Sequence, residues 1–370
     1  MLIYNAHVYT MSEGIIHNGW LSFENGKITG VGDADSQPAA ASTDINAEGA
    51  IVTPGIIDAH CHLGLFEDSQ RSDDTDDCNE WSAPVTPQMR VIDAINPLDV
   101  TFEQARRGGI TTVCALPGSA NPIGGQAAII KTRGNRVDNM VVRAPAALKI
   151  AFGENPRLHG KCQKDAPYTR MGTAALIREA FLIAKNYVRK DKPDVKSEVL
   201  QEVLAGKIPV HAHAHRACDM LTARRIADEF GFELVFVHAT EGDLIAEHLT
   251  RESVITGPTL GTREKPELRN LSFKTPAALS NAGLKIAICT DAPVLPIDSL
   301  PLMAGLAARA GMDSYEALRA ITLYPAAILK LADRLGAIKP GLDADIVLWQ
   351  GLPTNTDGKP RRVWINGEPV

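Results

Sequence analysis

The middle of the chain, between about residues 51 and 335, alternates short apolar runs with stretches of helical periodicity. This alternation is expected for repeated βα units, because parallel strands are buried on both faces and contain few polar residues. A weaker run at 127–130 would supply an eighth strand and complete a (β/α)8 barrel of the TIM type. The clearer strands are predicted at 51–57, 111–116, 147–152, 209–214, 234–237, 254–256 and 285–289. Helices are predicted at 101–107, 174–189, 218–230, 314–321 and 325–332.

The two ends of the chain show a different pattern, in which short strands are separated by turns. The N-terminal strands are predicted at 3–9, 19–24 and 28–31, and the C-terminal strands at 344–349 and 362–367. The dipeptide Asn25-Gly26 is typical of a tight hairpin turn. Two β-rich ends around an αβ middle predict one small β-sandwich domain, formed by residues 1–50 and 336–370. The barrel, residues 51–335, would be an insertion into it.

Length and composition are those of a globular protein with a large domain and a smaller one. The 370 residues exceed the length at which single cores usually stop growing, and 45% of them are hydrophobic. The net charge of -6 argues against nucleic acid or an anionic membrane as a partner and leaves a small-molecule substrate open. The segment Met1-Leu2-Ile3-Tyr4-Asn5 lacks the features of a signal peptide, so we expect a cytoplasmic protein.

Histidines cluster at the ends of two predicted strands. In Asp58-Ala59-His60-Cys61-His62, the period of two places His60 and His62 on one face, where they can bind one metal ion. This pair alone is equally compatible with ordinary core or surface histidines. The segment His211-Ala212-His213-Ala214-His215 places three more imidazoles on one face of a buried strand. An apolar core would not tolerate three unpaired imidazoles, which favours a metal site.

Two further polar residues end predicted strands. His238 follows the apolar run 234–237, and Asp291 follows the run 286–290. In a parallel barrel the carboxyl ends of the strands converge on the face that carries the active site. We therefore expect His60, His62 and the histidines at 213, 215 and 238 to meet Asp291. Asp291 alone could instead cap a helix, because it precedes a turn at Pro293.

At this point the sequence resembles the amidohydrolase superfamily, and within it the imidazolonepropionase-like enzymes. The resemblance covers nearly the whole chain. It includes Thr53-Pro54-Gly55-Ile56-Ile57-Asp58-Ala59-His60-Cys61-His62 near the start and Gly336-Ala337-Ile338-Lys339-Pro340-Gly341-Leu342-Asp343-Ala344-Asp345-Ile346-Val347 near the end. The resemblance implies metal ligands at His60, His62, His213, His238 and Asp291.

The resemblance also implies a chemistry, namely hydrolysis of an amide, cyclic amide or amidine-like carbon by metal-activated water. Asp291 would transfer the proton, and either the metal or His238 and His215 would polarise the carbonyl. Many related sequences read Thr-Asp-His-Pro where this chain has Thr290-Asp291-Ala292-Pro293. The expected cofactor is one or two divalent ions, with zinc favoured over manganese or iron, and a homo-oligomer would fit the family.

The fourth predicted strand offers two candidates for a ligand that bridges two ions. Lys149 resembles the carbamylated lysine of two-metal relatives, whereas Glu154 lies nearer the carboxyl end of the strand. We slightly favour Glu154. Lys149 could also be a buried structural amine, and Glu154 a turn residue before Pro156.

Two loops are expected near the pocket. The acidic segment 64–87 follows the first metal strand and could cover the substrate or contact another subunit, and the glycine-rich segment 117–126 follows the second strand. The favoured function is hydrolysis of a C–N bond. The alternatives are deamination of a small heterocycle and a non-catalytic barrel scaffold, although a scaffold would be expected to lack ligands.

Overall fold

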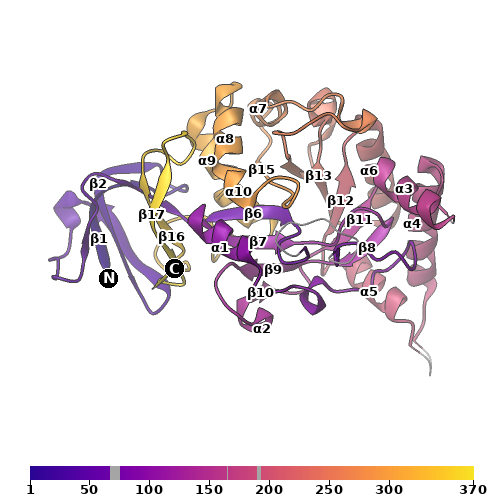
Figure 1. The fold of residues 1–370 in the computed structure, drawn as a ribbon, viewed down its shortest axis with the longest axis horizontal. Coiled ribbons are helices and arrows are strands. Elements are labelled where there is room, and N and C mark those ends of the chain that lie inside the picture. The colour runs from indigo at the N-terminus through magenta and orange to yellow at the C-terminus, as the bar shows by residue number, and fades with distance from the viewer. Residues whose placement is uncertain (67–75, 165, 190–192) are drawn as a thin grey trace.

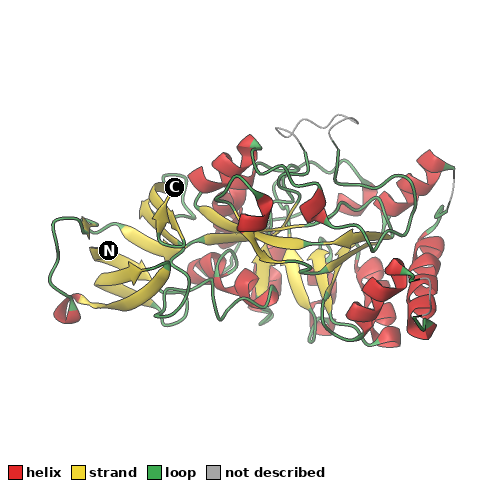
Figure 2. Cartoon of the chain, turned by 90° about the horizontal axis from the view of Figure 1, so that it is seen from below, coloured by secondary structure: helices red, strands yellow, loops and turns green. Residues whose placement is uncertain are grey.

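The computed structural model describes residues 1–66, 76–164, 166–189 and 193–370. Part of the acidic segment 64–87, namely 67–75, lies outside the described residues. The chain is a mixed α/β protein, with one sheet at one end and two sheets surrounded by helices over the rest (Figures 1 and 2). Among the described helices, none combines the length and apolar composition that a membrane crossing requires.

Both ends of the chain contribute to one eight-stranded sheet. Its strand order is β18-β17-β16-β5-β1-β2-β3, with β4 paired to β1. Asn25 and Gly26 both have positive φ, as the tight turn between β2 and β3 requires, so this predicted hairpin is confirmed. The strands are β1 (Leu2–Tyr9), β2 (Ile15–Glu24), β3 (Lys27–Asp33), β4 (Ile45–Asn46), β5 (Ile51–Pro54), β16 (Ile346–Gln350), β17 (Lys359–Ile365) and β18 (Glu368–Pro369).

The chain leaves this terminal sheet at Gly55. We predicted one strand at 51–57, but the structure divides it into β5, which pairs with β1 and β16, and β6 (Ile56–Cys61), which pairs with β7. A Cβ atom on Gly55 would lie 2.1 Å from Thr111 Oγ1, so only glycine fits where the chain passes between sheets. The apolar run was recognised correctly, but its division depends on that close contact.

Two central sheets contain the remaining strands. One has the order β10-β9-β7-β6 and the other β15-β14-β13-β12-β11-β8. Pairing between β6 and β7 and from β11 through β15 is parallel, as the apolar runs predicted. The strands are β7 (Ile110–Ala115), β8 (Ile123–Gln126), β9 (Ala128–Lys131), β10 (Val141–Arg143), β11 (Leu148–Ala151), β12 (Val210–Ala214), β13 (Leu234–His238), β14 (Ser253–Thr256) and β15 (Ile286–Ile288).

The weak run at 127–130 differs from the expected βα pattern. It forms β9, which is antiparallel to β7, and the preceding β8 is antiparallel to β11. Only residues 116–122 connect β7 to β8, whereas a parallel crossover needs roughly a dozen residues or more. The short connection therefore reverses the chain direction. Backbone hydrogen bonds between Ala127 and the segment 146–147 join the two sheets at this point.

Helices flank the central sheets (Figure 2). Asp99, Thr169, Asp194 and Asp313 cap four of them by accepting hydrogen bonds from backbone amides of the first turn. The helices are α1 (Val100–Arg107), α2 (Val137–Met140), α3 (Glu154–Gln163), α4 (Arg170–Asn186), α5 (Val195–Leu204), α6 (Ala217–Phe230), α7 (Lys274–Asn281), α8 (Leu300–Arg309), α9 (Ser314–Arg319) and α10 (Leu323–Ile328).

A buried ionic cluster joins the terminal sheet to the central sheets. Lys131 of β9 lies 2.6 Å from Asp345 and 3.6 Å from Asp343, both in the segment before β16. Asp343 also accepts contacts from Lys27 and Arg334, at 2.7 and 2.9 Å. Removing one partner from a buried ion pair leaves an uncompensated charge, which is costly.

We predict that Asp345→Ala lowers the free energy of unfolding by about 3–5 kcal/mol, because it leaves the Lys131 ammonium buried without its shortest ion pair. Urea denaturation monitored by circular dichroism measures this. The matched control is Asp93→Ala in the exposed pair Arg90–Asp93, which should cost less than about 1 kcal/mol. Equal losses in the two variants would contradict a special role for the buried cluster.

Candidate metal centre

The carboxyl ends of β6 and β15 meet, and this brings the first two histidines to Asp291. The backbone amide of Asp291 donates to the carbonyl of His60 at 3.2 Å, and that of His62 donates to the carbonyl of Ala292 at 2.7 Å. Asp291 Oδ1 then lies 3.2 Å from His60 Nε2 and 3.1 Å from His62 Nε2. The strand-end positions thus converge for these three residues.

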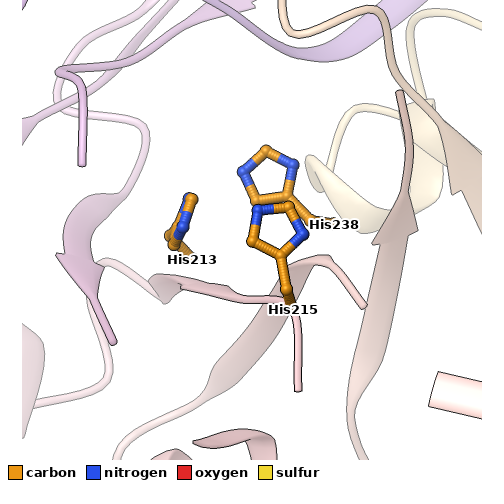
Figure 3. Close-up of side chains that lie close together, drawn as sticks. All are labelled: His213, His215 and His238. Carbon is orange, nitrogen blue, oxygen red and sulfur yellow. The ribbon is translucent and has the colours of Figure 1, made fainter. Parts of the chain in front are cut away.

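The histidines of β12 and β13 form a second group. His213, His215 and His238 each offer a ring nitrogen, and these atoms lie within 4.8 Å of one another. Figure 3 shows the rings gathered together, with those of His215 and His238 stacked at a centroid distance of 4.6 Å. His238 also belongs to the group with His60 and Asp291, so the two groups share one imidazole. This arrangement offers enough ligands for one ion or for two neighbouring ions.

On two of the rings, a hydrogen bond at Nδ1 determines which ring nitrogen is available to a metal ion. His62 Nδ1 lies 2.7 Å from the carbonyl of Leu116, and His238 Nδ1 lies 2.7 Å from the carbonyl of Gly257. A carbonyl only accepts, so both Nδ1 atoms carry a proton, and Nε2 is the nitrogen through which each ring can bind a metal ion; the neutral His238 ring presents a lone pair there. Oriented imidazoles of this kind are typical of metal ligands.

Electrostatics keep four of the five histidines neutral and Asp291 charged, whereas His62 differs: burial opposes its charge, but its contacts with Cys78 and Asp291 raise its pKa to about 10. Burial holds the pKa values of His60, His213 and His215 well below the usual range and lowers that of His238 to about 4. Burial opposes ionisation of Asp291, but His238, His60 and His62 hold its pKa well below the usual range. Metal binding requires deprotonated ligands. His60, His213, His215, His238 and Asp291 are already in that state near neutral pH, whereas His62 would have to release a proton when an ion binds.

Several buried atoms of the cluster have no hydrogen-bond partner among the residues that the structure describes, and this tests whether a metal fits. They are His60 Nδ1, both ring nitrogens of His213 and Asp291 Oδ1. Buried polar atoms are costly unless they are paired. A divalent cation would satisfy lone pairs of His213 and Asp291, and the set of neutral imidazoles and one carboxylate suits such an ion.

Backbone geometry at the same strand ends is unusual. His238, Ala239 and Asp291 have φ values of 74°, 45° and 54°, in the left-handed region that residues other than glycine rarely adopt. Such conformations persist only where surrounding contacts enforce them, and they concentrate at functional sites. The strained residues here are two candidate ligands and a neighbour, which agrees with a site built for chemistry.

Glu154, which we favoured as a bridging ligand, lies elsewhere. Its carboxylate is 3.0 Å from Arg216, and neither of the potential ligand groups found among the described residues contains it. The reason is local: Gly153 has a φ of 86° and turns the chain after β11, so that Glu154 enters the first turn of α3. Nearness to the carboxyl end of β11 in the sequence therefore did not indicate that the Glu154 carboxylate contacts Arg216.

Lys149 is the residue of β11 that reaches the cluster. Its side chain is fully buried, and Nζ lies 3.3 Å from His60 Nε2. Burial lowers the pKa of this amine to about 8. Lys149 faces the cluster because it alternates with the outward-facing residues of β11, as the period of two requires.

His211, the first of the three histidines in the segment 211–215, does not belong to either ligand group. His211 is buried and lies opposite Lys149 in the register of β11 and β12, but neither of its ring nitrogens has a hydrogen-bond partner in the described part of the chain. It lines a small cavity together with Pro209 and Leu329, towards the start of β12. The alternation predicted the shared face correctly, but it could not show how far along the strand the ligands extend.

Asp58 is a residue whose role the sequence reasoning missed. Its fully buried carboxylate accepts hydrogen bonds from the amide of His60 at 3.1 Å, and from the amide and hydroxyl of Thr290 at 3.1 and 2.5 Å. It therefore ties the residue before Asp291 to the first histidine strand. The signal was available, because Asp58, His60 and His62 alternate on one face.

The fold and this cluster define a class, that of metal-dependent hydrolases and deaminases. The family described as "Amidohydrolase family" matches residues 51–370, which include every candidate ligand. The chain belongs to the amidohydrolase family, and the resemblance noted from its motifs is confirmed.

Individual relatives agree with this assignment. The crystal structure of an amidohydrolase from Thermotoga maritima is 41% identical, with a TM-score of 0.95 over 100% of this chain and 99% of that one. The amidohydrolase tasK of Hapsidospora irregularis is 33% identical over 87% of this chain, which spans 36% of that relative. The imidazolonepropionase of Paracoccus denitrificans is 25% identical over 94% of this chain and 93% of its own length.

We predict that Asp58→Asn weakens metal binding by about 10–100-fold, because an amide cannot accept all the hydrogen bonds that orient His60 and Thr290. Competition with a chelator measures the affinity. The control is Asp99→Asn, which alters a buried carboxylate that accepts from Thr101 at the start of α1. Asp99→Asn should reduce stability without changing metal affinity, and an equal loss of affinity in both variants would refute the positioning role.

Proposed function

We propose that the protein is a metal-dependent hydrolase that cleaves the C–N bond of an amide or cyclic amide. The observation that carries this proposal is the convergence of neutral, buried imidazoles and the Asp291 carboxylate within two overlapping ligand groups. Family membership supports hydrolytic chemistry at carbon–nitrogen bonds. A scaffold without catalysis would not need a ligand set held in this protonation state.

We also propose that the two central sheets are parts of one closed (β/α)8 barrel, residues 51–335, with one pair of reversed segments. The contacts of β15 with β6 support closure on one side, and the bonds of Ala127 to the segment 146–147 support it on the other. The terminal sheet, from residues 1–50 and 336–370, would then be a separate small domain of the sandwich type. Its own apolar cluster supports this division.

The residues proposed to hold the metal are His60, His62, His213, His238 and Asp291. Zinc is favoured over manganese or iron because the set is rich in imidazole. When bound, such an ion acts as a Lewis acid and lowers the pKa of a water molecule. Whether the site holds one ion or two depends on the fourth-strand residue.

Asp291 and two histidines are proposed to act on the substrate. Asp291 is ionised, so it can accept a proton from the attacking water and deliver it to the leaving nitrogen. His215 Nδ1 contacts the hydroxyl of Thr240 at 2.8 Å, which orients the ring beside His238. His215 would donate a hydrogen bond to the carbonyl oxygen of the substrate and polarise it, whereas His238, whose Nδ1 proton is directed to Gly257, would act through the metal ion that it holds.

Lys149 replaces Glu154 in this proposal as the fourth-strand ligand. Its position 3.3 Å from His60 supports the assignment, as does the ion pair that occupies Glu154. The amine would react with carbon dioxide: an N–C bond forms, one amine proton leaves, and the resulting carbamate supplies two oxygen atoms. A neutral amine is required, and burial of Lys149 favours that form.

We predict that His213→Ala removes bound metal and lowers kcat/KM by more than about 100-fold, because it deletes a buried ligand of the shared cluster. Elemental analysis and activity towards a panel of cyclic amides measure these effects. His211→Ala is the matched control, since it removes an imidazole from the same strand outside the ligand groups. Wild-type protein that lacks metal and gains no activity from added zinc, manganese or iron would contradict the function.

The same panel separates hydrolysis from deamination. Ring opening of a cyclic amide without ammonia release supports the proposed reaction. Ammonia released from an amino-substituted heterocycle, with the ring intact and no cyclic amide opened, would replace the proposal with the deaminase alternative.

A further prediction concerns Lys149. Protein equilibrated with ¹³C-bicarbonate should show one carbamate signal by ¹³C NMR, and Lys149→Met should lose both this signal and bound metal, because the bridging oxygens disappear. Lys131→Met is the control, since it removes another buried lysine that is paired with Asp345. The absence of a carbamate signal from the wild-type protein, or a signal of equal strength from Lys149→Met, would contradict carbamylation of Lys149.

A further inference from the structure

A cavity of about 390 Å³ lies directly beside the metal centre. One wall comes from His62 and the residues after it, the second from Thr101 and Gln104 of α1, and the third from the segment 292–298 that follows β15. Its volume is near the lower end of the roughly 300–1,000 Å³ typical of small-molecule sites. The cavity is therefore large enough for a side group of a substrate.

Part of the cavity wall is apolar. Leu63 and Ile297 are buried, and Leu295 is half-buried. The ring of Phe66 stands edge-on to the imidazole of His62, with centroids 6.5 Å apart. Solvent in such a pocket is readily displaced by an apolar group, because burial of apolar surface is favourable.

The cavity is continuous with the candidate ligands. His62 belongs both to its wall and to the cluster, where Nε2 lies 3.1 Å from Asp291 Oδ1. Ala292 directly follows Asp291, lines the cavity and accepts the backbone hydrogen bond of His62. Because Ala292 carries only a methyl group, no long side chain separates the cavity from Asp291.

Polar groups on the cavity wall limit the kind of substituent that fits. The Gln104 amide and the Asp298 carboxylate both contribute to it, and neither side chain makes a hydrogen bond or ion pair within the part of the chain that the structure describes. None of the described residues that line the cavity is a lysine or an arginine. An anionic substituent would meet the Asp298 carboxylate with no compensating cation from the described lining, so the cavity suits neutral groups.

We propose that this cavity binds a neutral aliphatic or aromatic substituent of the substrate, attached next to the carbon at which the C–N bond is cleaved. The preferred substrate class is then amides and cyclic amides with a branched aliphatic or phenyl-sized side group. This inference rests on the proposed function, since it places the reacting carbon at the metal centre.

Hydroxamic acids test the inference without catalysis, because they bind metal ions directly. The zinc-loaded wild-type protein is titrated by calorimetry with acetohydroxamate, isovalerohydroxamate, phenylacetohydroxamate and succinic monohydroxamate. The isovaleryl and phenylacetyl compounds should bind about tenfold or more tightly than acetohydroxamate, as expected for filling an apolar pocket. The anionic succinyl compound should gain no such advantage.

Two variants at one position connect the preference to the cavity. Leu295→Trp should fill the space and reduce the advantage of the larger compounds to less than about threefold, while acetohydroxamate binds as in the wild type. Leu295→Ala should enlarge the cavity and shift the preference towards the phenylacetyl compound. Val294→Ala is the control, because Val294 is exposed in the same segment and does not line the cavity. Thermal melts and metal content establish that each variant is folded and loaded.

The outcomes distinguish the two proposals. Equal affinities for all four compounds in the wild type, or a preference that survives Leu295→Trp, would overturn the substituent pocket and leave the metal centre intact. If no hydroxamate binds to the zinc-loaded protein, the proposed function fails, and the pocket fails with it.

Discussion

The contact between the carboxyl ends of β6 and β15 is the interaction on which the site depends. Two backbone hydrogen bonds and the buried carboxylate of Asp58 join these ends, although they are more than 200 residues apart in sequence. Without this contact, Asp291 would not face His60 and His62. The same contact places Ala292 beside His62, so the ligand cluster and the neighbouring cavity share one structural cause.

The electrostatic balance of the cluster explains why it can persist in a buried position. Burial strongly disfavours charged imidazole, so His60, His213, His215 and His238 stay neutral and cost less to desolvate than cations would. Asp291 remains charged because histidines surround it. The cluster therefore carries unpaired lone pairs and a negative charge, which oppose stability in the protein alone and favour a cation.

The terminal sheet contributes to the same architecture from a distance. Asp343 and Asp345 lie in the motif near the end of the chain, and they hold Lys131, which belongs to a reversed strand of the central sheets. Ion pairs buried at a contact between sheets fix the relative position of the sheets, because moving one charged partner away leaves the other charge buried without compensation. The motif that suggested a family relationship thus has a structural role.

The sequence by itself indicated the αβ alternation of the middle, the β-rich ends and the histidine and aspartate positions at strand ends, because these follow from local periodicity and from residue type. It could not decide between Glu154 and Lys149, since that choice depends on a glycine turn that directs one residue to Arg216 and on the inward face of β11. The sequence also did not predict that β8 and β9 run antiparallel to their neighbours, because the direction of a strand depends on the length of its connection and on its pairing partner. Only the tertiary structure could bring Asp58 to Thr290 or form the cavity, because both require residues that are distant in sequence to meet.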